Sequence, residues 1–289
     1  MAVIFCDSNC ELWHDKAKSL GLKVIKMPYT LSGQEYYYDL GEKTDFKAFY
    51  DAMRKGNTPT TSALNAEDYK EYFEPYFKAG EEILYISFSS KLSATFNFME
   101  QAVAELKQKY PNARFVRFDT KGVSMTAGIQ VYLAASYYKS GKTIDETVAY
   151  LEEITTHIFA EFLVDDLKYL RRGGRISGAA AIMGTILQMK PILKVNSEGE
   201  LAKSATVNGR TKALTFLVEQ FKSNVIEKDK YPVIILHADC EADALKLKER
   251  LIAENTEGEL DIWIQPVGPT VGTHCGPGTL ALIFYASGR

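Results

Sequence analysis

The feature that most constrains the fold is a regular alternation of short apolar segments with amphipathic ones over the first 153 residues. The apolar segments at 3–7, 23–28, 83–88 and 113–118 have the length and the β-branched or aromatic character of buried strands. Apolar residues at three- and four-residue spacing lie between them, which is typical of helices. Strands that alternate with helices in this way predict a parallel sheet with helical crossovers.

The second half follows a different pattern, and we place a domain boundary at residues 155–156. Residues 191–195 and 201–207 predict a hairpin, and residues 178–189, apolar nearly all round, predict a buried helix. Further strands are expected at 158–164, 233–236, 260–267 and 279–285. The sequence therefore predicts an α/β fold with two domains, a parallel-sheet domain at 1–155 and a mixed α/β domain at 156–289.

Hydroxyl side chains are concentrated in two loops of the first domain. One set follows the strand at 83–88: Ser87, Ser89, Ser90, Ser93 and Thr95. The other set lies in the loop at 57–65: Thr58, Thr60, Thr61 and Ser62. A hydroxyl-rich turn between a strand and a helix directs O–H and N–H donors at an anion. Each serine alone is more simply a helix cap, but their density predicts an anion site.

A second informative stretch, residues 268–278, contains four glycines and two prolines around His274. We expect a rigid loop whose backbone approaches a ligand closely. A histidine held there can donate to an anion or titrate near neutral pH. The alternative is a structural turn with an incidental histidine.

Positive charge is concentrated at residues 166–212, which hold nine Lys or Arg and three acidic residues in a chain of net charge −3. The Arg-Arg-Gly-Gly-Arg run at 171–175 is a tight turn carrying fixed charge. This asymmetry suggests one basic surface for an acidic or phosphate-bearing partner, or else a solvated face.

The sequence lacks the motifs that are typical of several functional classes. The chain has no G-x-x-x-x-G-K-[ST], G-x-G-x-x-G or G-x-S-x-G motif, and its basic region has no aromatic interleaving typical of nucleic-acid binding. No apolar window is long enough for a membrane span, and residues 1–7 do not resemble a signal peptide. Four cysteines without a C-x-x-C pair and four scattered histidines predict no metal and a reducing cytoplasm. The remaining features are neutral hydroxyl donors, a histidine and arginines beside apolar segments. They indicate a protein that binds an apolar molecule with an anionic head group.

Together these residues resemble the DegV family, which includes the fatty-acid-binding subunit (FakB) of bacterial fatty acid kinase. The matching stretches occur in the family's order along essentially the whole chain: Asp-Ser at 7–8, Thr-Ser at 61–62, Ser-Ser-Lys-Leu-Ser-Ala-Thr at 89–95, Tyr-Leu-Arg-Arg-Gly-Gly-Arg-Ile-Ser at 169–177, Lys-Pro-Ile-Leu at 190–193, Arg210 with Ala213, and Gly-Thr-His-Cys-Gly-Pro-Gly at 272–278.

The resemblance implies a two-domain DegV-like fold that encloses one fatty acid between its domains. It implies that Thr61 and Ser93 hold the carboxylate near His274, with Ser62, Thr95 and Thr273 also in the ligand site. A separate ATP-dependent kinase subunit would phosphorylate the carboxylate for phospholipid synthesis, so the chain itself is not an enzyme. No cofactor is expected, and the chain is expected to be a monomer. Candidates for docking the kinase are Arg172, Arg175 and Arg210.

The sequence departs from the family pattern beside the predicted head-group site. Ala63 and Leu64 stand where Gln and Pro are usual, and Ala94 stands where Gly is usual. Two alternatives therefore stay open: a carrier or sensor of another apolar anion, and an independent phosphotransferase, because the fold resembles the substrate-binding domain of dihydroxyacetone kinases.

Overall fold

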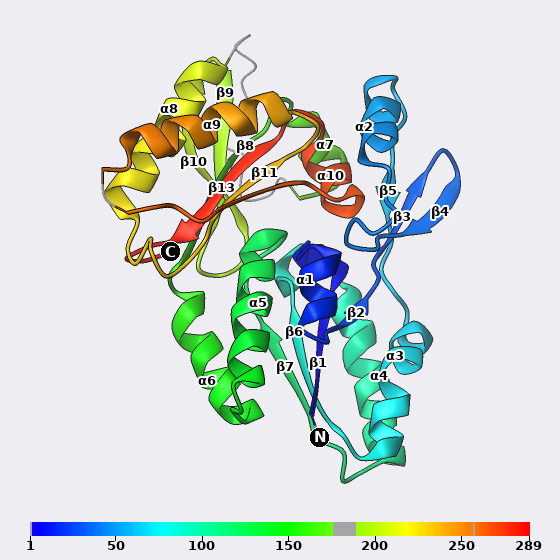
Figure 1. Cartoon of the computed structure of the whole chain (residues 1–289). Helices are drawn as coiled ribbons and strands as arrows, with labels where there is room; N and C mark the ends of the chain where they lie inside the picture. The colour runs from blue at the N-terminus through cyan, green and yellow to red at the C-terminus, as the bar shows by residue number, and fades with distance from the viewer. Residues whose placement is uncertain (1, 176–188, 257) are drawn as a thin grey trace. The chain divides into compact units, whose positions relative to one another are not determined.

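The computed structural model of the chain describes residues 2–175, 189–256 and 258–289 (Figure 1). They form two compact units, Met1–Thr44 with Thr60–Thr155 and Asp45–Pro59 with Thr156–Arg289. Segment Asp45–Pro59 thus belongs to the second unit, whereas the division predicted from the sequence placed it in the first.

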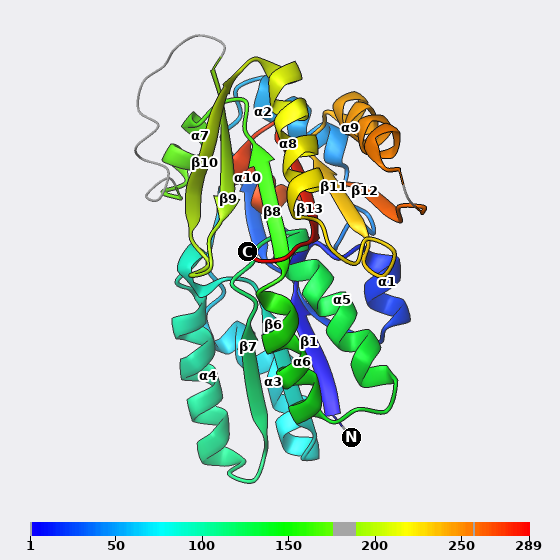
Figure 2. The same cartoon turned by 90° about the vertical axis from the view of Figure 1, so that its left-hand side faces the viewer.

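The first unit is built on a four-stranded parallel sheet, as predicted, and the structure shows its strand order to be β2-β1-β6-β7. Helices α3 and α4 cover one face and α5 and α6 the other (Figures 1 and 2). The helix α1 (His14–Ser19) joins β1 to β2. The strands are β1 (Ala2–Asp7), β2 (Lys23–Ile25), β6 (Glu82–Ser87) and β7 (Phe115–Asp119). The covering helices are α3 (Ala66–Ala79), α4 (Thr95–Lys109), α5 (Met125–Lys139) and α6 (Ile144–Thr155).

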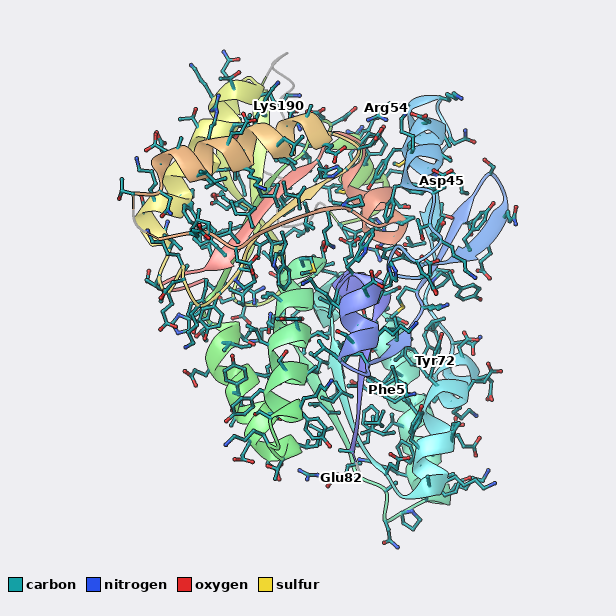
Figure 3. The ribbon with its side chains drawn as sticks, in the orientation of Figure 1. Phe5, Asp45, Arg54, Tyr72, Glu82 and Lys190 are labelled. Carbon is teal, nitrogen blue, oxygen red and sulfur yellow. The ribbon has the colours of Figure 1, made fainter. Side chains whose placement is uncertain are left out.

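Aromatic side chains fill the core between this sheet and α3. Phe5 of β1, labelled in Figure 3, packs edge-on against Phe73 at 5.2 Å and Tyr76 at 5.3 Å. Asn65 caps α3, because its side chain accepts from the Asp68 N–H while the Asp68 carboxylate accepts from the Asn65 N–H. The sequence therefore fixes both the buried face and the start of this helix.

A small antiparallel sheet of order β4-β3-β5 also belongs to the first unit. It consists of β3 (Pro28–Leu31), β4 (Gln34–Tyr37) and β5 (Thr60–Thr61). The prediction of one strand over 23–28 is wrong, because β2 ends at Ile25 and β3 begins at Pro28. The turn at Ser32 and Gly33, with φ of 53° and 81°, closes a hairpin of the two-residue kind.

The second unit contains a six-stranded mixed sheet of order β10-β9-β8-β13-β11-β12. Helices α8 (Arg210–Asn224) and α9 (Glu241–Glu254) pack their apolar sides on one face of it (Figure 1). The predicted hairpin is confirmed by the antiparallel pairing of β9 with β10. The strands are β8 (Ile158–Leu163), β9 (Met189–Val195), β10 (Leu201–Asn208), β11 (Val233–His237), β12 (Ile262–Pro266) and β13 (Leu280–Tyr285).

The helix predicted at 178–189 lies outside the described residues, apart from Met189, which begins β9. Among the residues that the structure does describe, no helix is long and apolar enough to cross a bilayer.

Two kinds of contact join the helix α2 (Phe46–Arg54) to the rest of the second unit. The buried Tyr50 hydroxyl donates to the Val267 carbonyl at 2.8 Å. Arg54, labelled in Figure 3, forms an ion pair with Asp239 and donates to its carbonyl at 3.0 Å. These contacts explain why a segment from the N-terminal third of the chain belongs to this unit.

The stretch 268–278 is not the rigid loop that its glycines and prolines suggested. Residues Pro269–Cys275 form a helix, α10, whose first position is proline, where its fixed φ and missing N–H cost nothing. The N–H of Gly272 donates to the Gly268 carbonyl at 2.7 Å, and Gly276, with φ of 79°, ends the helix. His274 therefore stands in the last turn of a helix.

A carboxyl group is buried in the core of the second unit, and it should make stability depend on pH. Glu161 of β8 is 3% exposed, its Oε1 accepts from the Ser204 hydroxyl, and within the described residues its Oε2 has no hydrogen-bond partner. Burial raises the pKa of Glu161 above its ordinary value of 4.5, against the opposing effects of Ser204 and Lys194.

We expect Glu161→Gln to stabilise the protein at pH 8 and to have little effect at pH 4. Above pH 4.5 the unfolded chain releases the Glu161 proton more readily than the folded chain, so the wild type loses stability as pH rises through this range. Urea midpoints of both proteins at the two pH values measure the difference. The exposed Glu249→Gln variant is the control, and an equal gain at pH 4 and pH 8 would contradict the prediction.

Candidate functional site

Most hydroxyls of the turn after β6 are engaged in local hydrogen bonds. The Ser90 hydroxyl donates to Asp119 Oδ2 at 2.6 Å, and Ser89 Oγ accepts from the Lys91 N–H at 3.2 Å. The Ser87 hydroxyl donates to a carbonyl of β7 at 3.3 Å. Local hydrogen bonds therefore engage these three hydroxyls, and Ser93 and Thr95 remain to be described.

Ser93 and Thr95 differ sharply in exposure. Thr95, the first residue of α4, is 1% exposed, and its hydroxyl is hydrogen-bonded to the Tyr69 hydroxyl at 2.9 Å. Ser93 is half-buried, and its Oγ accepts from the Thr95 N–H at 3.2 Å. Because α4 has an alanine, Ala94, at its N-cap, Ser93 supplies a polar group that the cap residue cannot.

The other predicted hydroxyls of the first unit lie on β5 and just after it. Thr61 is half-buried and pairs with Tyr29 of β3, whereas Ser62 is exposed. Thr61 thus belongs to the small sheet, and Ser93 to the connection between β6 and α4. The structure joins Ser93 to Thr95 directly and holds Thr61 on a separate element.

In the second unit, α10 packs closely against α7 (Lys168–Arg172) and α2. A Cβ at Gly272 would overlap with the Tyr50 hydroxyl, and a Cβ at Gly276 would overlap with the ring of Tyr169. A Cβ at Gly173, in the turn after α7, would overlap with the His274 ring. These glycines therefore serve close helix packing, and Gly173 makes room for the histidine.

His274 lies beside two of the predicted arginines. Burial, together with the charges of Arg175 and Arg172, lowers the pKa of His274 to about 4. The imidazole is therefore neutral at pH 7, contrary to the expectation that it would titrate near neutrality. Its ring can exchange hydrogen bonds with a ligand, while positive charge in this cluster comes from the arginines.

The remaining predicted residues have structural contacts. Thr273 is 4% exposed, and its hydroxyl donates to the Pro269 carbonyl at 2.8 Å. Arg210 donates through Nη1 to Asp165 at 3.0 Å and through Nε to Asp243 at 2.7 Å. Arg172, by contrast, is exposed, with its guanidinium 5.2 Å from the Tyr169 ring. Of the three predicted docking arginines, the structure places Arg172 and Arg175 together with His274 and commits Arg210 to ion pairs.

Sequence reasoning included Asp7 among the matching stretches but missed the buried tyrosines beside it, Tyr69 and Tyr85. Asp7 is fully buried at the end of β1 and accepts from the hydroxyl of Tyr85 on the neighbouring strand β6 at 3.0 Å. The position of Asp7 at a strand's carboxyl end is a signal that the sequence shows, whereas Tyr69 and Tyr85 resemble ordinary core aromatics in the sequence. Within the part of the chain that the structure describes, no group of three or more metal-ligating side chains occurs.

Comparisons with known proteins decide the family. The model described as "Uncharacterised protein, DegV family COG1307" matches residues 1–287. The chain belongs to the DegV family. A DegV domain-containing protein of Clostridium perfringens is 39% identical over 98% of this chain and 96% of its own. One from Lactococcus lactis is 34% identical over 96% of both chains.

Solved DegV structures share the fold over nearly the whole chain. A DegV family protein from Thermus thermophilus, described for its fatty acid binding, has a TM-score of 0.87 and 27% identity over 99% of both chains. DegV from Bacillus subtilis, described as a fatty acid binding protein, has a TM-score of 0.83 and 25% identity over 99% of both chains. The α/β architecture expected from the sequence is thereby confirmed.

Proposed function

We propose that this DegV protein binds one long-chain fatty acid, with the acyl chain buried and the carboxylate held by Thr61 and Ser93 near His274. The observation that carries the proposal is the full-length match to DegV structures described as fatty acid binding. Ser93 supports it because it is half-buried and its Oγ accepts from the Thr95 N–H at 3.2 Å.

The energetics favour a hydrocarbon chain as the source of affinity. Burying about fourteen methylenes gains roughly 11 kcal/mol at ~0.8 kcal/mol each, of which association consumes several. Neutral hydroxyl donors contribute only about 1–3 kcal/mol each toward a charged acceptor. The hydroxyls therefore select and orient the carboxylate rather than provide most of the binding.

We further propose that the chain presents this carboxylate to a separate ATP-dependent kinase subunit, which forms an acyl-phosphate for phospholipid synthesis in the cytoplasm. The exposed Arg172 beside the half-buried Arg175 supports a docking surface for an acidic partner. In this proposal the chain contributes ligand and orientation, and the partner contributes the chemistry.

The first experiment is mass spectrometry of an organic extract from the purified protein. A stoichiometric fatty acid is the expected result. An empty extract, with no thermal shift on adding fatty acids, would favour another apolar anion and would link Ala63, Leu64 and Ala94 to that change. Turnover of a phosphorylated product without a partner would favour an independent enzyme.

We expect Thr61→Val combined with Ser93→Ala to weaken fatty acid binding by about 30-fold or more, because two donors to a carboxylate are lost. A fluorescent fatty acid displacement assay measures this change. Ser90→Ala is the matched control, since its hydroxyl comes from the same turn but already donates to Asp119. A double variant with wild-type affinity would show that these hydroxyls do not hold the carboxylate.

A further inference from the structure

The strand β7 lies at an open edge of the parallel sheet in the first unit (Figure 2). Among the residues that the structure describes, β7 pairs with β6 alone, and each of its five residues is half-buried. An edge strand presents a row of backbone N–H and C=O groups that have no partner strand. The open edge of β7 is therefore suited to pairing with another polypeptide.

The pairing with β6 decides which backbone groups of β7 point outward. The Arg114 carbonyl, just before β7, accepts from an N–H of β6 at 2.9 Å, and the Thr120 N–H, just after β7, donates to a carbonyl of β6 at 3.0 Å. Because the backbone groups of successive residues point to opposite sides of a strand, the even-numbered residues between these two positions also face β6. Phe115, Arg117 and Asp119 consequently direct their N–H and C=O groups to the open edge.

A groove of about 450 Å³ lies between β7 and the helix α4. The side chains of the three outward-facing residues of β7 line one side of it. Its apolar lining consists of Phe115 of β7 and of Met99, Val103 and the exposed Ala104 of α4. The outward backbone groups and the groove therefore form one surface, which we call the β7 edge.

The groove also carries a positive charge that the described part of the chain does not balance. Arg117 is compensated, because its Nη1 lies 3.8 Å from a carboxylate oxygen of Glu100 and its Nη2 lies 3.5 Å from one of Asp119. Lys107, which also lines the groove, is exposed and forms no ion pair with any residue that the structure describes. An acidic side chain of a bound partner would complement this charge.

The residue at the centre of β7 disfavours pairing between two copies of this chain. Arg117 is the middle residue of Phe115–Asp119, so a fully overlapping antiparallel pair of β7 strands would place one Arg117 directly opposite the other. Like charges that face each other across two strands are destabilising. The charge pattern therefore favours a different polypeptide as the occupant of the β7 edge.

We propose that the β7 edge binds an extended segment of a partner protein, which adds a strand to the four-stranded sheet through Phe115, Arg117 and Asp119. Alternate side chains of the segment enter the groove, and they are apolar except for one acidic residue that pairs with Lys107. None of the residues expected to bind the fatty acid contributes to this surface, so the inference is independent of the proposed function.

A displayed library of random octapeptides, selected on the wild-type protein, supplies the probe. We expect the enriched peptides to alternate apolar with polar residues and to contain an acidic residue. Their affinity should fall by about tenfold or more in Ala104→Trp, because the large side chain occupies the groove. A library that yields no enriched peptide overturns the inference, and so do enriched peptides that bind Ala104→Trp as tightly as the wild type.

Gln108→Trp is the matched control for the groove, because Gln108 is equally exposed on α4 but is not part of the lining. It should bind the enriched peptides as the wild type does. An equal loss of affinity in the two tryptophan variants would contradict binding in the groove.

A pair of lysine variants tests the charge. Lys107→Glu should weaken binding by about 3–30-fold, since it replaces an attraction to the acidic residue by a repulsion. Lys78→Glu makes the same change in net charge at an exposed position of α3 and should leave the affinity unchanged. Equal affinities of the two variants would overturn the role of Lys107.

Amide hydrogen exchange, followed by NMR on the wild-type protein, identifies the mode of binding without relying on any variant. In the free protein the amides of Val116 and Phe118, which face β6, should exchange slowly, whereas those of Phe115, Arg117 and Asp119 should exchange fast. A bound peptide should slow the second group by about tenfold or more and leave the first group nearly unchanged. A complex that forms without protecting the outward amides of β7 would overturn the inference.

Discussion

Gly276→Ala should lower the free energy of unfolding by about 2–6 kcal/mol. Gly276 has φ of 79° and ψ of 166°, a region that residues other than glycine enter at a cost of about 1–3 kcal/mol. The added Cβ would also overlap with the ring of Tyr169, and such overpacking typically costs ~1–3 kcal/mol more. Urea denaturation followed by circular dichroism measures the loss.

Gly209→Ala separates these two contributions. Gly209 lies in the same unit with nearly the same backbone, φ of 83° and ψ of 159°, but a Cβ there would meet nothing within 4 Å. It should therefore lose only the backbone part, about 1–3 kcal/mol. Equal losses in the two variants would show that the contact between α10 and Tyr169 contributes nothing to stability.

Arg210→Ala should destabilise the protein by about 3 kcal/mol or more. The side chain, 21% exposed, donates to Asp165 and Asp243 and also to the Gly278 carbonyl at 2.6 Å. These contacts connect the start of α8 to the segment after β8, to the start of α9 and to the residues just before β13. Removing the side chain takes away three charge-assisted hydrogen bonds, each worth about 1.5–3 kcal/mol, and leaves Asp165 with Lys190 and Asp243 with Lys246 as ion-pair partners. Thermal denaturation measures the change.

Arg172→Ala is the control for this prediction. Its side chain is exposed and contacts the Tyr169 ring face, so we expect a stability change below about 1 kcal/mol. Phosphorylation of bound fatty acid by a kinase subunit should be impaired in Arg172→Ala if this arginine docks the partner. Wild-type stability of Arg210→Ala would contradict a structural role for Arg210 and would favour its role in docking the kinase.

The main strands and helices could be predicted because they leave strong periodic signals. The buried strand β6 and the helix α4 follow from residues such as Ile83, Met99 and Val103, which are all buried as their spacing requires. The hairpin of β3 and β4 was missed because its second strand is exposed along its whole length. A strand without a buried face has no alternation of apolar and polar residues to recognise.

The site could be predicted only in part, because residue type does not reveal hydrogen-bond partners. Ser90 and Ser93 are the same residue three positions apart, yet Ser90 donates to Asp119 whereas Ser93 accepts from the Thr95 backbone. The neutral state of His274 depends on burial and on Arg175, which is distant in the sequence. Such roles arise from tertiary contacts that a linear pattern does not contain.

The attachment of α2 to the second unit has a consequence for synthesis on the ribosome. The Tyr50 hydroxyl can form its hydrogen bond only after Val267, 217 residues later, has been synthesised. At about 5–20 residues per second, this delay is roughly ten to forty seconds. During that time the apolar side of α2, with Phe49, Tyr50 and Met53, emerges without the surface that later covers it. The first unit can complete its sheet early, whereas the second unit becomes complete only when nearly the entire chain has been made.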